Sequence, residues 1–94
     1  MRIRGIVWLR EIVDKLAVKH RVEPHEVEEV LANTTQFRFV EKGERHGEDV
    51  YLALGQSDAG RYIAVLFIYK KTREALILNA RDMAAKERKQ YGKK

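Results

Sequence analysis

A few side chains in this sequence can move protons near neutral pH. His20 is one candidate, because an imidazole titrates close to pH 7, although on pattern alone it equally suits packing at the end of an apolar helical stripe. His46 and Glu48 form a second candidate pair just before an apolar run, with a solvated polar loop as the alternative interpretation. His25 follows a proline at a helix start and is interpreted as a surface residue.

The same residue types give no metal motif. The histidines do not have the H-E-x-x-H spacing or a similar ligand pattern, so we expect no metal site. The chain has no cysteine, which excludes disulfides, thiolate metal sites and cysteine nucleophiles. We expect no cofactor.

The stretch 61–79 predicts two paired strands. Residues 61–69 are apolar on both alternating faces, as in a central strand that is covered on both sides. The charged residues 70–73 predict a hairpin turn, and residues 74–79 predict the returning strand.

A basic helix is predicted directly after this strand, from Ala80 to Tyr91. Asn79 would be its N-cap, and Asp82 would complete a short capping box. Arg81 would then lie in the first turn, beside backbone N–H groups that have no intrahelical partner. Such a position suits phosphate, so the sequence predicts an anion site around Arg81.

Other cations are spaced to share helix faces. Lys15 and Lys19 are four residues apart, and Arg81 and Arg88 are two helical turns apart. Both pairs are candidates for binding phosphates, with ordinary solvated helix surface as the alternative. Tyr91 could stack on a base or attach the last helix to the sheet.

Length and composition predict one α+β domain over residues 1–94. Lys and Arg outnumber Asp and Glu by 19 to 14, which favours a polyanionic or acidic partner. No apolar run approaches a membrane span or a signal sequence, so we expect a cytoplasmic protein without membrane association. The patterns predict N-terminal helices over 9–20 and from Pro24, an antiparallel sheet of three to four strands, and a C-terminal helix; residues 3–9 fit either a strand or a helix start.

Three segments resemble the BrnT toxins, which belong to the RelE-like superfamily of bacterial toxin–antitoxin ribonucleases. The family's W…K…KHGV…EE opening is matched by Trp8, Lys15, Lys19-His20-Arg21-Val22 and Glu26. Its H…E-R…IG strand is matched by His46-Gly47-Glu48-Asp49-Val50-Tyr51 and Leu54-Gly55. Its IISAR…ER..Y ending is matched most closely, by Ile77-Leu78-Asn79-Ala80-Arg81, Glu87-Arg88 and Tyr91.

The resemblance implies a RelE-like fold and a type II toxin that cleaves mRNA without a metal. It also implies an antitoxin partner with a ribbon-helix-helix DNA-binding fold, through which the pair would bind its promoter. Cleavage needs a base for the 2′-OH, cations for the transition state and an acid for the leaving oxygen. His20 or the His46/Glu48 pair would transfer protons, and the phosphate would be neutralised by Arg81, Lys15 and Lys19.

The chain departs from the family pattern at two positions. Val50 and Leu76 stand where the family carries arginine. Arg45, Arg61 and Arg73 are candidates to supply the missing charge. The departures keep open an alternative function, a non-catalytic RelE-like fold that binds an antitoxin or nucleic acid.

Overall fold

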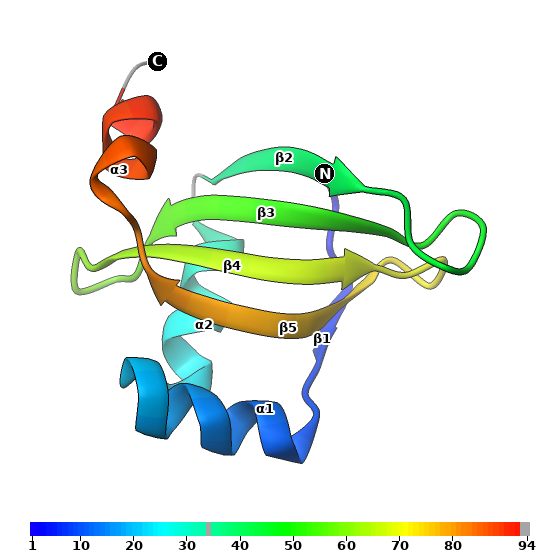
Figure 1. The fold of residues 1–94 in the computed structure, drawn as a ribbon, viewed down its shortest axis with the longest axis horizontal. Helices are drawn as coiled ribbons and strands as arrows, with labels where there is room; N and C mark the ends of the chain where they lie inside the picture. Colours follow the sequence, from blue (N-terminus) through cyan, green and yellow to red (C-terminus); the bar gives the residue numbers. More distant parts are fainter. Residues whose placement is uncertain (34, 93–94) are drawn as a thin grey trace.

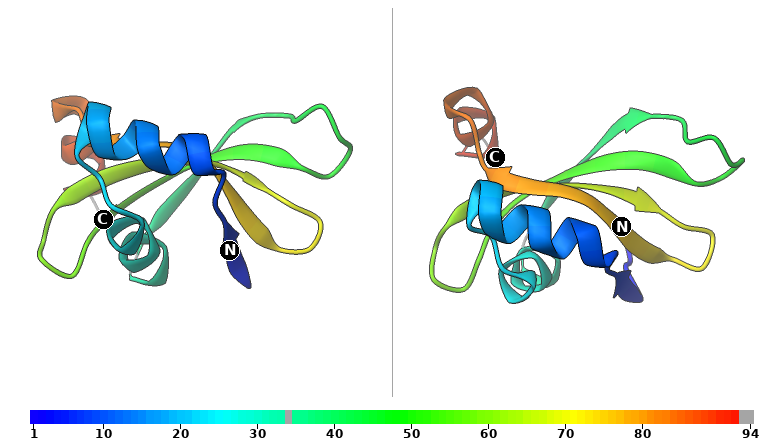
Figure 2. Two further views of the ribbon diagram at one scale, coloured as in Figure 1. Left: turned by 90° about the horizontal axis from the view of Figure 1, so that it is seen from below. Right: turned by 60° about the horizontal axis from the view of Figure 1, so that its bottom comes forward.

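A computed structural model describes residues 1–33 and 35–92 as one α+β domain (Figure 1). A five-stranded sheet carries two helical segments on one face and a short helix on the other (Figure 2). The elements in chain order are β1 (Gly5–Val7), α1 (Arg10–Lys15), the π-helical turn η1 (Leu16–His20), α2 (Pro24–Ala32), β2 (Gln36–Glu41), β3 (Asp49–Gln56), β4 (Tyr62–Tyr69), β5 (Glu74–Asp82) and α3 (Ala85–Gly92). The predicted α+β class is confirmed.

The sheet has the strand order β1-β5-β4-β3-β2. The strand predicted to be central, β4, lies in the middle of the sheet. The turn from β4 to β5 is closed by a hydrogen bond in which the N–H of Arg73 donates to the carbonyl of Lys70 at 2.8 Å. The strands β2 to β5 pair antiparallel, in agreement with the predicted sheet of three to four strands, and β1 adds a fifth strand parallel to β5, so the sheet is mixed. This strand spans only three residues, too few for its periodicity to be recognised in the sequence.

Both predicted N-terminal helices are present. The first continues from α1 into η1 and ends at Arg21, whose φ of 52° is left-handed. The second begins with a capping box between Glu23 and Glu26 and has Pro24 in its first turn, where a missing N–H costs nothing.

Alternating residues of the strands face the two sides of the sheet. One side packs against α1, η1 and α2 and forms the main core, in which Phe67 is fully buried. Its other buried members are Leu16, Val22, Val27, Val30, Ala53, Ile63, Val65, Ala75, Ile77 and Ala80. A smaller cluster of Leu54, Ala64, Met83 and Tyr91 lies under α3 on the other side.

The predicted start of the C-terminal helix is wrong. Strand β5 continues to Asp82, which pairs with Ile63, because β4 offers it partners over its whole length. Asn79 is therefore a strand residue and not a helix cap. Helix α3 starts at Ala85, and Glu87 accepts a hydrogen bond from the N–H of Ala84 at 2.8 Å.

Candidate functional site

The side of the sheet that faces away from α1 and α2 is covered by α3 at one end only (Figure 2). Next to the pair of Gln56 and Tyr62, which lies at the α3 end, the strand register arranges its residues in three rows across the sheet. The row nearest α3 is Gln36, Leu54, Ala64 and Arg81. The middle row is Arg38, Leu52, Leu66 and Asn79. The outer row is Glu41, Val50, Ile68 and Leu76. We call these three rows the open face.

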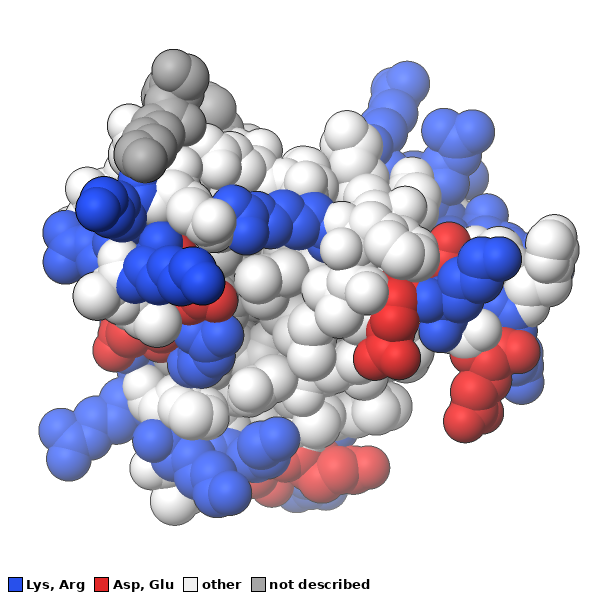
Figure 3. Space-filling model, turned by 45° about the horizontal axis from the view of Figure 1, so that its top comes forward, with Lys and Arg blue, Asp and Glu red and all other residues white. Residues whose placement is uncertain are grey.

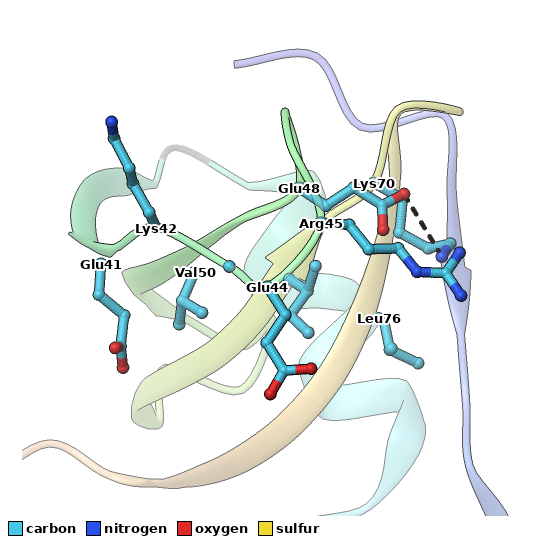
Figure 4. A pocket seen from close by; sticks show the side chains of 10 residues that line it. Glu41, Lys42, Glu44, Arg45, Glu48, Val50, Lys70 and Leu76 are labelled. Carbon is cyan, nitrogen blue, oxygen red and sulfur yellow. Dashed lines mark ion pairs between the residues drawn. The ribbon is translucent and has the colours of Figure 1, made fainter.

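A cleft of about 540 Å³ lies over the outer row, beneath the loop 42–48. Figure 4 shows its lining side chains, which come from the strands β2, β3, β4 and β5, the loop 42–48 and the β4–β5 turn. They are Glu41, Lys42, Gly43, Glu44, Arg45, Glu48, Val50, Ile68, Lys70 and Leu76. The floor is apolar, whereas the loop and the β4–β5 turn supply the charges.

Glu48 fixes the loop to the β4–β5 turn. Its carboxylate lies 3.6 Å from the Lys70 ammonium and accepts the N–H of Lys71 at 3.2 Å. The hydrogen bond from Lys71 is the main reason that the pKa of Glu48 is lowered. Glu48 is therefore ionised and hydrogen-bonded near neutral pH, which suits a structural role better than proton donation. His46 lies on the same loop and is exposed.

The opposite wall of the open face is cationic. Arg81 makes an ion pair with Glu87 of α3, with two hydrogen bonds of 2.6 and 2.9 Å. Arg88 lies over the ring of Tyr62 at 4.1 Å, and the positive charge of Arg38 contributes to the lowered pKa of Glu87. Figure 3 shows an uncharged area with basic residues on both sides of it, and on the side of the loop acidic residues lie among them. The cations on the two sides are Arg38, Arg81 and Arg88, and Lys42, Arg45 and Lys70.

His20 belongs to a different part of the molecule. Its carbonyl, like that of Arg21, accepts a hydrogen bond from Arg61, whose guanidinium also binds Glu26 and Asp82. Asp82 ends β5, whereas the loop with His46 lies at the other end of the sheet, where β3 begins. The strand rises by six residue steps from Leu76 to Asp82, which corresponds to roughly 20 Å. His20 and His46 therefore cannot act on the same phosphate.

The other predicted residues are also separated. Lys15 and Lys19 are exposed on α1 and η1, the helical side of the sheet. Tyr91 is buried at 8% exposure and packs edge-on against Tyr62, with ring centroids 6.0 Å apart. Its ring attaches α3 to the sheet and offers little surface for a base. Trp8 is partly buried against the main core.

Of the three arginines considered as substitutes at the positions of Val50 and Leu76, one lies at the cleft. Arg45 lines it together with both apolar residues. Arg61 is engaged by Glu26 and Asp82, and Arg73 lines a separate hollow with Arg2 and Arg4. The sequence interpretation missed Arg38, Lys42, Glu44 and Lys70 as residues of this face. Only the strand register, combined with the loop's fold over the outer row, brings them together.

Comparisons with known proteins find no family model and no curated protein that matches this chain. Over residues 1–33 and 35–92, no three His, Asp or Glu side chains are placed to hold a metal ion. No helix in the same part of the chain is long and apolar enough to cross a membrane.

Proposed function

We propose that this protein is a BrnT-like type II toxin, an endoribonuclease that binds mRNA across the open face. The observation that carries the proposal is the convergence of two distant motif segments on that face. Val50 comes from the segment that starts at His46, and Asn79, Arg81 and Glu87 come from the C-terminal segment. Residues nearly forty positions apart in the chain then line one surface with basic residues on both sides.

The cleft supplies chemistry for cleavage without a metal. Arg45 and Lys70 would neutralise the phosphate as negative charge develops, since both charges lie at the apolar floor. Glu44 or His46 would take the proton from the 2′-OH, because both lie on the loop and Glu48 is already bound to the β4–β5 turn. The 2′ oxygen would attack phosphorus and form the cyclic phosphate as the P–O5′ bond breaks, and the leaving 5′ oxygen would take its proton from water.

The test is cleavage of a labelled RNA by the purified protein in the presence of a chelator. We expect products with a 2′,3′-cyclic phosphate, and none from RNA whose 2′-OH groups are methylated. Arg45→Ala should lower the rate at least about tenfold, and so should whichever of Glu44→Ala and His46→Ala removes the base. Arg10→Ala, an exposed change on the helical side, is the matched control. Full activity in Arg45→Ala, or in both Glu44→Ala and His46→Ala, would rule out this placement of the site.

The expected partner is an antitoxin with a ribbon-helix-helix DNA-binding fold, and promoter DNA would be bound only through it. A neighbouring reading frame for such a protein, whose product copurifies with this chain and suppresses growth arrest, would support this pairing. Growth arrest without any such partner would argue against it.

One observation favours the alternative of a non-catalytic domain that binds an antitoxin or nucleic acid. The outer row presents Val50, Ile68 and Leu76 as three adjacent apolar side chains, where the family pattern has two arginines. A combined Val50→Arg and Leu76→Arg variant separates the two functions. If the natural chain does not cleave RNA and the variant does, the chain has kept the fold without the chemistry. If both cleave, the ribonuclease proposal stands.

A further inference from the structure

Three arginines form a second cationic site next to the cleft. Arg2 and Arg4 precede β1, and Arg73 lies in the β4–β5 turn, yet the three side chains line one hollow. Within residues 1–33 and 35–92, their guanidinium groups make no ion pair and no hydrogen bond. Clustering three unpaired guanidiniums costs repulsion, which a bound anion would relieve.

The backbone around this hollow is held in place. The N–H of Arg4 donates to the carbonyl of Arg73 at 2.8 Å, and the hydroxyl of Tyr69 donates to the carbonyl of Arg2 at 2.6 Å. The carboxylate of Glu74, the residue after Arg73, accepts a hydrogen bond from the Thr72 hydroxyl at 2.8 Å and makes no ion pair with the three arginines. The main chain that carries the three arginines is therefore fixed, and their charges are not neutralised by an ion pair with any acidic side chain that the structure describes.

The β4–β5 turn connects this hollow to the cleft. Lys70, at the start of the turn, lines the cleft, and Arg73, at its end, lines the hollow. Figure 4 shows the N-terminal segment passing behind the side of the cleft where Lys70 and Arg45 lie. A chain of phosphates that follows the turn from the cleft to the hollow passes two carboxylates, that of Glu48, which is paired with Lys70, and that of Glu74, which is hydrogen-bonded to Thr72.

We propose that Arg2, Arg4 and Arg73 bind the backbone of single-stranded RNA that extends out of the cleft. This rests on the proposed function, and it adds a substrate property: long RNA binds more tightly than short RNA. RNA is favoured over an acidic protein because the hollow is lined by guanidinium side chains alone and offers no apolar anchor.

The test is binding of fully 2′-O-methylated RNA, which cannot be cleaved, followed by fluorescence anisotropy. The oligonucleotides have about 4 and about 16 nucleotides. The variant Arg2→Ala with Arg4→Ala should bind the long RNA about tenfold more weakly and lower its salt-dependence slope by about 1.4, while leaving the short RNA unchanged. Arg73→Gly should act in the same direction, and glycine fits the φ of 70° there.

The control loses the same charge elsewhere, through Arg10→Ala with Arg21→Ala on the helical side. If both double variants bind long RNA equally well, the proposal is overturned. It is also overturned if Arg2→Ala with Arg4→Ala binds polyglutamate more weakly than the natural chain does but binds RNA unchanged. The two proposals fail separately. If the natural chain binds long RNA more tightly than short RNA but does not cleave ordinary RNA, only the ribonuclease proposal is rejected. If it cleaves RNA and Arg2→Ala with Arg4→Ala still binds long RNA normally, only the proposed arginine site is rejected.

Discussion

Arg81 and Glu87 are joined by two parallel hydrogen bonds, Nη1 to Oε1 at 2.6 Å and Nη2 to Oε2 at 2.9 Å. The pair fastens α3 to the end of β5, and Glu87 also accepts the N–H of Ala84. Arg81 is 38% exposed and Glu87 is 16% exposed, so one side of the pair remains open to solvent. Arg81 therefore has a structural role in addition to any contact with RNA.

The first prediction separates these two roles of Arg81. Glu87→Gln breaks the ion pair but keeps the guanidinium, so it should lower the free energy of unfolding by about 1–2 kcal/mol while preserving or strengthening RNA binding. Arg81→Ala should lower both the free energy of unfolding and RNA affinity. Urea unfolding and anisotropy with uncleavable RNA measure the two quantities. If Glu87→Gln weakened RNA binding as much as Arg81→Ala, Arg81 would act only by holding α3.

The second prediction concerns pH. The pKa of Glu87 is lowered mainly by Arg81, and the pKa of Asp82 mainly by Arg61. A carboxyl group with a lowered pKa stabilises the fold above its unfolded pKa of about 4, and this contribution disappears as the pH falls through the folded value. The free energy of unfolding should be nearly constant from about pH 7 to 5 and should decrease as the pH is lowered further. The difference in the free energy of unfolding between the wild type and Glu87→Gln should shrink as the pH falls below about 5. A difference that stays constant down to about pH 2 would contradict this linkage.

Local periodicity was enough to predict the helices and most of the strands. The capping residues around Pro24 and the apolar run at β4 each point to one structure. The end of β5 could not be predicted in this way, because Asn79 and Asp82 have good helix-capping chemistry. Pairing with Leu66 and Ile63 of β4 outweighs that local preference.

The site was less predictable than the fold. The sequence predicts Arg81 as an anion-binding residue in the first turn of a helix, whereas Arg81 lies in β5 and its ion pair with Glu87 depends on the position of α3. His20 and His46 looked like alternatives for one site and instead lie at opposite ends of the sheet. Arg45 could be placed at the cleft only once the loop was known to fold over the outer row. Side chains that meet through long-range pairing leave no spacing signal in the sequence.

The third prediction concerns a buried polar atom in the middle row. Among the described residues, Asn79 Oδ1 is buried without a hydrogen-bond partner. Asn79→Leu should raise the free energy of unfolding by about 1 kcal/mol, because it removes an unsatisfied polar group beside Leu66. The same change at Asn33, whose amide donates to Gln56 and Asp58 at 3.0 Å, should lower it. Thermal or urea unfolding compares the two variants with the natural chain. A lower free energy of unfolding in both variants would contradict this account of Asn79.

The last prediction concerns the loop over the cleft. A Cβ on Gly43 would lie 1.8 Å from the carbonyl oxygen of Glu48, so alanine there must push the two sides of the loop apart. Gly43→Ala should free Glu48 from the N–H of Lys71 and accelerate hydrogen exchange at that amide at least about tenfold. RNA binding at the cleft should weaken in parallel.

Gly5→Ala is the matched control for this change, because its nearest contacts, on Glu74, are an ordinary 3.8 Å away. It should leave exchange at Lys71 and RNA binding unchanged. Faster exchange in Gly43→Ala with unaltered RNA binding would show that RNA does not use the loop. The cleft would then be excluded as the binding site, while the cations around Arg81 would remain candidates.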